Sequence, residues 1–125
     1  MVRKILIVDD SAMVRRNVRQ ALEPTDFTVM EAHDGADGLA KIDAHPDLVL
    51  VICDVNMPGM NGVEMVEALH AAGGLSVPVV MLTTDGRPAL MVRAKAAGVK
   101  GWIVKPFKPA MLRAEVQRIV GAAGS

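Results

Sequence analysis

Carboxylates directly follow two apolar runs of this sequence. Asp9 and Asp10 come after four aliphatic residues, and Asp54 comes after six apolar residues. Two further apolar runs end in other polar groups, the hydroxyl of Thr83 and the ammonium group of Lys105. Short apolar runs of this kind are typical of buried parallel strands, whose carboxyl ends meet at one edge of a sheet. We therefore expect these five side chains to gather at that edge.

The expected group of side chains predicts a particular chemistry. Packed carboxylates repel one another, and a divalent cation with a preference for oxygen ligands relieves that repulsion. Asp9, Asp10 and Asp54 therefore predict a Mg²⁺ site. Positive and hydroxyl groups around a carboxylate stabilise the negative charge that develops in phosphoryl transfer. With Lys105 and Thr83 beside it, Asp54 is the expected nucleophile, and its product is an aspartyl phosphate.

Each of these residues has a plainer explanation when it is taken alone. An aspartate after a strand is usually a helix cap or a turn residue, an Asp-Asp pair is often a solvated loop, and a Lys-Pro pair is usually a turn. Here each group falls at the end of a different expected strand. This joint placement favours the functional interpretation.

The elements that must position these groups alternate along the chain. Short runs rich in Val and Ile predict strands, and amphipathic stretches between them predict helices. Five βα units in sequence specify one α/β domain over residues 1–125, a five-stranded parallel sheet with helices on both faces. The second strand is the most polar and is expected at a sheet edge. The expected strands are residues 4–8, 27–32, 48–53, 77–82 and 101–104.

Helix ends carry their own signals. Asp34 is expected to cap a helix that runs to about residue 45, and Asn61 with Glu64 forms a capping-box pattern. Pro88 suits a first helical turn, and Gly98 suits the end of the same helix.

The first and last helices are expected from their apolar faces. In the first helix Val14 and Val18 face the core, and Arg15 is expected to point largely outward. The last helix is expected to end near Gly121.

Composition excludes several classes of protein. The chain has 14 basic and 14 acidic residues and only 2% aromatic residues, so neither a basic field nor a stacking surface for nucleic acid is expected. A single cysteine, Cys53, excludes a disulfide framework and is expected in the core. No signal peptide or membrane-spanning stretch is expected, and the expected compartment is the cytoplasm.

The chain resembles the receiver domains of two-component response regulators over essentially its whole length, and most closely the single-domain chemotaxis members. That family has a flavodoxin-like (βα)5 fold with strand order 2-1-3-4-5, so the resemblance implies this order here. The stretch that begins at Asp54 is the most specific part of the likeness. The motifs that carry it are residues 7–11, 54–62, 82–84 and 105–107.

The resemblance implies roles at the acidic site. Asp54 matches the phosphoacceptor, and Asp10 matches the direct Mg²⁺ ligand. Asp9 matches an acidic neighbour that acts partly through water, and Asn56 matches a residue whose backbone carbonyl binds the metal. Lys105 matches the lysine that pairs with the phosphoryl group.

The resemblance also implies a switch. Thr83 matches the hydroxyl residue that binds the phosphoryl group, and Trp102 matches an aromatic switch position that usually holds Tyr or Phe. Lys105–Pro106 matches a peptide bond that is typically cis. Thr84 stands where the family usually has a smaller residue.

Three residues near the acceptor match positions that tune the family's phosphoryl chemistry. Asn56 and Asp85 match two variable positions that influence the attack of water, and polar residues there imply a short-lived phosphorylated state. Thr84 is branched and is expected to narrow access to Asp54.

The helix over residues 88–97 is rich in alanine, so little apolar area is expected to hold it. We expect it to shift on phosphorylation and to form an output surface with the last strand and the last helix. The plain alternative for its basic residues is a solvated face. The expected output residues are Arg87, Arg93, Lys95, Lys100, Trp102 and Lys108.

The expected function is a stand-alone switch that a histidine kinase phosphorylates and that catalyses only its own phosphorylation and dephosphorylation. Its expected partner is a protein such as a flagellar motor switch component or a phosphatase. A phosphorelay or phosphate-sink receiver remains open. A phosphatase enzyme is disfavoured because such enzymes typically carry a second Asp where this chain has Asn56. We expect no DNA binding and a monomer, since residues 99–101 lack the acidic pattern of the family's dimers.

Overall fold

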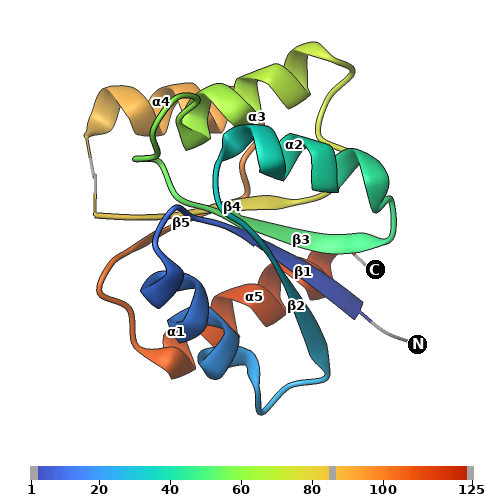
Figure 1. The fold of residues 1–125 in the computed structure, drawn as a ribbon, viewed down its shortest axis with the longest axis vertical. Coiled ribbons are helices and arrows are strands. Elements are labelled where there is room, and N and C mark those ends of the chain that lie inside the picture. Colours follow the sequence, from blue (N-terminus) through green and yellow to red (C-terminus); the bar gives the residue numbers. More distant parts are fainter. Residues whose placement is uncertain (1–2, 85–86, 124–125) are drawn as a thin grey trace.

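A parallel sheet of five strands forms the centre of the protein (Figure 1). The computed structural model describes residues 3–84 and 87–123, and only the backbone of residues 122 and 123. The strand order is β2-β1-β3-β4-β5, and every pairing is parallel, which confirms the order that the resemblance implied. The strands are β1 (Arg3–Val8), β2 (Phe27–Ala32), β3 (Leu48–Cys53), β4 (Val79–Thr83) and β5 (Gly101–Val104).

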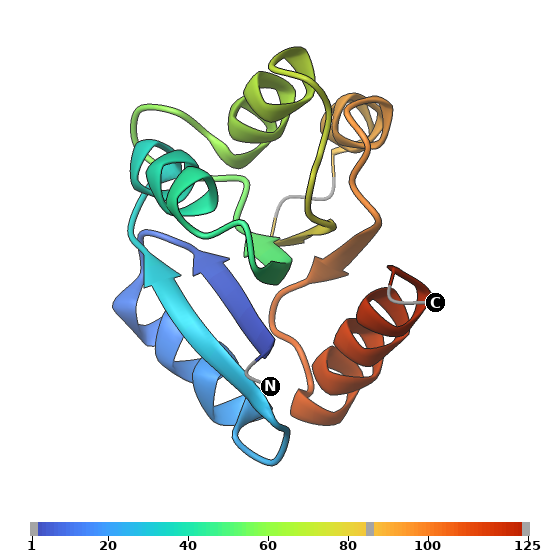
Figure 2. The same cartoon turned by 90° about the vertical axis from the view of Figure 1, so that its right-hand side faces the viewer.

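Helices cover both faces of the sheet, as predicted. Helices α2, α3 and α4 lie on one face and α1 and α5 on the other (Figures 1 and 2). Within the described residues no helix is both long and apolar enough to cross a bilayer. The helices are α1 (Ala12–Leu22), α2 (Gly35–Ala44), α3 (Gly62–Ala71), α4 (Pro88–Ala96) and α5 (Pro109–Ala123).

Alternation along the strands divides the hydrophobic core into two layers. Leu6 and Val8 of β1 join the cluster under α2, α3 and α4, whereas Ile5 and Ile7 join the cluster under α1 and α5. Successive strand residues point to opposite faces, so a strand covered on both sides must be apolar throughout. Cys53 is fully buried and burial raises the pKa of its thiol, which confirms the core placement.

The predicted helix signals are present in the structure. Asp34 caps α2 by accepting a hydrogen bond from the Asp37 N–H, and Asn61 and Glu64 form a complete capping box on α3. Pro88 opens α4. Gly98 follows α4 with φ +102°, a left-handed conformation that favours glycine.

The bounds of β4 and of α5 differ from the prediction. The fourth strand begins at Val79 rather than at residue 77, because Pro78 has no N–H to donate to the ladder. Thr83, expected just after this strand, is its last residue. The last helix continues past Gly121 to Ala123.

Candidate functional site

The pairing of β1 with β3 brings Asp9 and Asp54 together. Val8 and Cys53 are partners in the register, so the two aspartates are the next residues on neighbouring strands. The Asp54 N–H donates to the Val8 carbonyl oxygen at 2.9 Å, and the Asp9 N–H donates to the Ala32 carbonyl oxygen at 3.0 Å. The ladder thus holds both backbones one residue beyond the strands.

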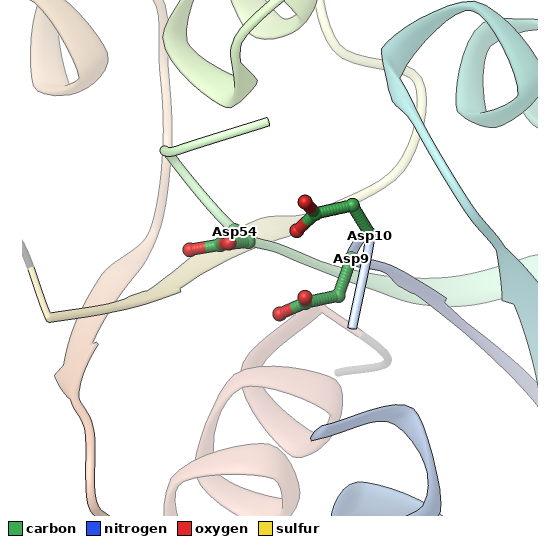
Figure 3. A group of neighbouring side chains, drawn as sticks. All are labelled: Asp9, Asp10 and Asp54. Carbon is green, nitrogen blue, oxygen red and sulfur yellow. The ribbon is translucent and has the colours of Figure 1, made fainter. Parts of the chain in front are cut away.

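Asp10 completes an acidic cluster with Asp9 and Asp54. One carboxylate oxygen from each residue lies within 4.8 Å of the others, and Figure 3 shows the three side chains gathered at the ends of β1 and β3. Asp9 is fully buried and Asp54 is 5% exposed, whereas Asp10 is exposed. The predicted grouping of carboxylates is confirmed, with one member open to solvent.

Lys105 crosses to this cluster from the end of β5. Its Nζ lies 3.0 Å from Asp9 Oδ2 and 3.4 Å from Asp54 Oδ1. Burial and the charge of Asp9 raise the pKa of Asp54, and Lys105 and the backbone N–H of Asn56 oppose that rise. Because the pKa of Asp54 stays raised, the lysine only partly offsets the cost of the buried negative charge.

The cluster fits a hard divalent cation. Its donors are carboxylate oxygens, which Mg²⁺ prefers, and the exposed Asp10 leaves one side open to solvent for the waters that Mg²⁺ retains. Lys105 only partly offsets the negative charge of Asp54, and a cation would stabilise that charge further.

The other predicted residues surround the cluster at different depths. Thr83 is fully buried at the end of β4, and its carbonyl oxygen accepts a hydrogen bond from the Lys105 N–H at 2.9 Å. Asn56 is exposed, and Thr84 is an exposed residue on a groove of about 490 Å³ between α1 and the start of α5. The Lys105–Pro106 bond is cis, as predicted. Asp85 lies outside the described residues.

Two neighbours of the cluster escaped the sequence reasoning. The Ser11 N–H donates to Asp9 Oδ1 at 2.9 Å, and Ser11 also caps α1. Arg15 was expected to point outward, but it is half-buried and donates to the Asp9 carbonyl oxygen at 2.6 Å. A serine at the start of a helix was a usable cap signal. The helical pattern alone could not show that Arg15 turns back towards the strand end.

The expected output surface lies on α4 and β5. Lys95 and Lys100 are exposed and line a groove of about 310 Å³ together with Trp102. Trp102 packs partly into the core, and its Nε1 is buried without a hydrogen-bond partner among the described residues. Ala94 is the only buried residue of α4, so little apolar area holds this helix, as predicted.

Not every basic residue of this surface is a free charge. Arg93 makes a two-pronged ion pair with Glu67 of α3, with Nη2 2.6 Å from Oε1. Lys108 is exposed beside Trp102, Val104 and Met111, and both Val104 and Met111 are largely exposed. The surface is therefore partly apolar and carries positive charge.

Comparison with known proteins identifies the family. The family model described as response regulator receiver domain matches residues 5–117. The chain belongs to the response regulator receiver family. This receiver is 38% identical to the chemotaxis protein CheY1 of Helicobacter pylori strain J99 over 120 residues, covering 94% of this chain and 97% of that one.

Solved receiver structures have the same fold. Chemotaxis protein CheY4 of Vibrio cholerae, crystallised at low pH, has a TM-score of 0.85 and 38% identity, covering 95% of this chain and 99% of that chain. A CheX–CheY–BeF3–Mg complex from Borrelia burgdorferi has a TM-score of 0.86 and 27% identity, covering 94% and 88%. This receiver therefore resembles the single-domain CheY proteins of chemotaxis.

Family membership has general consequences for this receiver. Receivers are typically phosphorylated on an aspartate and bind Mg²⁺ in an acidic pocket. They are signalling proteins rather than enzymes in the usual sense, and they act between a histidine kinase and downstream targets.

Proposed function

We propose that residues 1–125 form a single receiver domain that works as a stand-alone phosphorylation switch, with Asp54 as the acceptor of a phosphoryl group from a histidine kinase. The observation that carries this proposal is the position of the Asp54 carboxylate. It is almost buried, lies within 4.8 Å of two other carboxylates and faces the Lys105 ammonium at 3.4 Å. The carboxylates favour the binding of a cation, and the Lys105 ammonium favours the binding of a negatively charged group such as a phosphoryl group.

In the transfer, an Asp54 carboxylate oxygen attacks the phosphorus atom of a phosphohistidine. The new O–P bond forms as the N–P bond breaks, and the imidazole leaves with the bonding pair and takes up a proton. Lys105 stabilises the charge on the phosphoryl oxygens, and the Thr83 hydroxyl binds one of them.

Asp9, Asp10 and Asp54, with the carbonyl of Asn56, are the proposed holders of Mg²⁺. When bound, the ion supplies positive charge that offsets the carboxylates and the phosphoryl oxygens. Asp9 also holds Lys105 in place through the 3.0 Å pair. Asn56, Thr84 and Asp85 are the proposed determinants of how quickly water removes the phosphoryl group, which is the protein's own dephosphorylation.

The proposed output passes through Thr83 and Trp102. Movement of Thr83 towards the phosphoryl group leaves space behind it, and Trp102 turns to fill that space. Helix α4, held by one buried alanine, then shifts and changes the surface that includes Lys95 and Lys100. We propose that the receiver is a monomer and that its target is a protein of chemotaxis, such as a motor switch component or a phosphatase. The chemotaxis names of its relatives and the solved complex of a CheY with CheX support a protein target.

Intact mass spectrometry after incubation with a small phosphodonor tests the proposal. We expect wild type to gain one phosphoryl group with Mg²⁺ and none with EDTA. Asp54→Asn should gain none, whereas Asp43→Asn, a matched change at an exposed aspartate of α2, should behave as wild type. Equal labelling of Asp54→Asn and wild type would refute Asp54 as the acceptor.

A second assay separates the switch from a relay. The phosphorylated protein is mixed with a histidine phosphotransfer domain, and the mass of both is followed. A switch should lose its phosphoryl group to water, whereas efficient return to the histidine would favour the relay function.

A further inference from the structure

The guanidinium group of Arg15 links three separate segments beside the acidic cluster. Arg15 lies in the first turns of α1, and its Nε–H donates to Glu31 Oε1 of β2 at 2.9 Å. Its Nη1–H donates to the Asp9 carbonyl oxygen at 2.6 Å. The Arg15 side chain is only 18% exposed. One planar group thus connects the helix, the edge strand and the loop that carries the carboxylates.

The bond from Arg15 acts on the peptide group between Asp9 and Asp10. On its other side Asp9 is already held, since its N–H bonds Ala32 and its carboxylate accepts hydrogen bonds from Ser11 and Lys105. The Asp10 carboxylate is exposed, so its direction depends on the backbone that carries it. A fixed Asp9–Asp10 peptide plane therefore limits where the Asp10 carboxylate can point.

Glu31 keeps Arg15 in this orientation. Burial of Glu31 favours its neutral form, but hydrogen bonds from Arg15 and Arg19 outweigh that effect, so the pKa of Glu31 is lowered. The ion pair therefore remains charged at neutral pH. A guanidinium paired in this way presents its second edge to the Asp9 carbonyl in a fixed direction, which a flexible ammonium could not do.

We propose that Arg15 is a positioning residue that strengthens Mg²⁺ binding by fixing the Asp9–Asp10 peptide, an inference that rests on the proposed Mg²⁺-dependent function. The effect of charge alone on Mg²⁺ affinity has the opposite sign. Loss of a positive group near three carboxylates would make cation binding tighter, whereas loss of a positioning bond makes it weaker. The sign of the change therefore separates the two effects.

The test is a calorimetric titration of Mg²⁺ into wild type, Arg15→Met and Arg16→Met at low salt. Arg16 is the matched control, an exposed neighbour on the same helix whose loss changes the net charge equally. We expect Arg15→Met to raise the Mg²⁺ dissociation constant about tenfold, in the range known for residues that orient metal ligands. Arg16→Met should stay within about twofold of wild type or bind slightly tighter. Equal constants for the two variants, or tighter binding by Arg15→Met, would overturn the proposal.

Two further variants protect the test against a folding defect. Arg15→Lys keeps the charge and most of the side-chain packing, and it should still weaken Mg²⁺ binding because it cannot bond Glu31 and the Asp9 carbonyl together. Arg19→Met removes another partner of Glu31 without touching Asp9, and it should leave Mg²⁺ binding close to that of wild type. Wild-type affinity in Arg15→Lys and Arg15→Met, each shown to be folded by urea titration, would overturn the role of Arg15.

Failure of this inference differs from failure of the proposed function. If wild type binds Mg²⁺ and is labelled on Asp54 while Arg15→Met binds Mg²⁺ equally well, only the role of Arg15 is refuted. If wild type itself binds no Mg²⁺ at millimolar concentration, both proposals fail.

Discussion

Gly62 is the position where one added methyl group should do most damage to the candidate site. This residue opens α3, and its N–H donates to the Val55 carbonyl oxygen at 2.9 Å. A Cβ on Gly62 would lie 1.9 Å from the carbonyl oxygen of Asp54 and 2.8 Å from its carbonyl carbon. Both atoms are backbone, so no side-chain rotation relieves the clash. Gly62→Ala must therefore push the start of α3 and the Asp54 peptide apart by about 1 Å.

The magnitude follows from three contributions. Overpacking of this kind costs about 3 kcal/mol, and a weakened Gly62–Val55 hydrogen bond costs about 1 kcal/mol. The better helix propensity of alanine returns up to about 1 kcal/mol. We expect a net loss of about 3 kcal/mol in the free energy of unfolding. With a urea m-value of about 2 kcal/mol per molar, the midpoint should fall by about 1.5 M.

Urea titration followed by the fluorescence of Trp102, the only tryptophan, measures this change. Gly121→Ala is the matched control, because a Cβ on Gly121 meets nothing within 4 Å and the residue lies in α5. That variant should gain about 0.5 kcal/mol from helix propensity. Gly62→Ala should also be labelled more slowly by a phosphodonor, since Asp54 has moved. A Gly62→Ala midpoint equal to that of wild type would refute the close approach of Gly62 to Asp54.

Three other changes have expected outcomes. In EDTA, Asp54→Asn should be more stable than wild type, and the difference in their free energies of unfolding should widen as pH rises above about 4. The reason is that the pKa of Asp54 is raised, so its ionisation costs the folded state more than the unfolded state. Urea midpoints at several pH values that show a constant difference would contradict this. Lys105→Met leaves Asp9 and Asp54 without the ammonium group that they share. It should lower the free energy of unfolding by about 3 kcal/mol in EDTA, and Mg²⁺ should restore part of that loss. Thermal melts with no Mg²⁺ effect would be evidence against the proposed metal site. Glu67→Gln breaks the exposed ion pair with Arg93. It should lower the melting temperature only slightly at low salt and not at high salt. A large drop in melting temperature that persists in high salt would show that the pair is not a screened surface contact.

Local pattern was sufficient to predict most of the elements. Runs of Val and Ile showed the strands, and capping residues such as Asp34 and Asn61 showed where helices begin, because caps and periodicity depend on neighbours in the chain. Where the prediction missed, the cause was also local. Pro78 cannot join the ladder through an N–H, so β4 starts one residue after it.

The site was predictable in part for the same reason. Asp9 and Asp54 each follow a strand directly, so parallel pairing of β1 and β3 is enough to bring them together. The strand ends also predicted Lys105 at this edge, but not that its Nζ contacts both Asp9 and Asp54. Strands β3 and β4 separate β5 from β1, so about three strand spacings of roughly 4.8 Å lie between the two backbones.

By itself, then, the sequence determined which residue types stand at the strand ends, and with them the acidic cluster. Only the tertiary structure decided how these groups touch: Lys105 between Asp9 and Asp54, Arg15 on the Asp9 carbonyl, and Gly62 against the Asp54 backbone. The physical reason is that periodicity and capping depend on neighbours in the chain. These three contacts depend instead on strand order, side-chain reach and the packing of segments far apart in sequence.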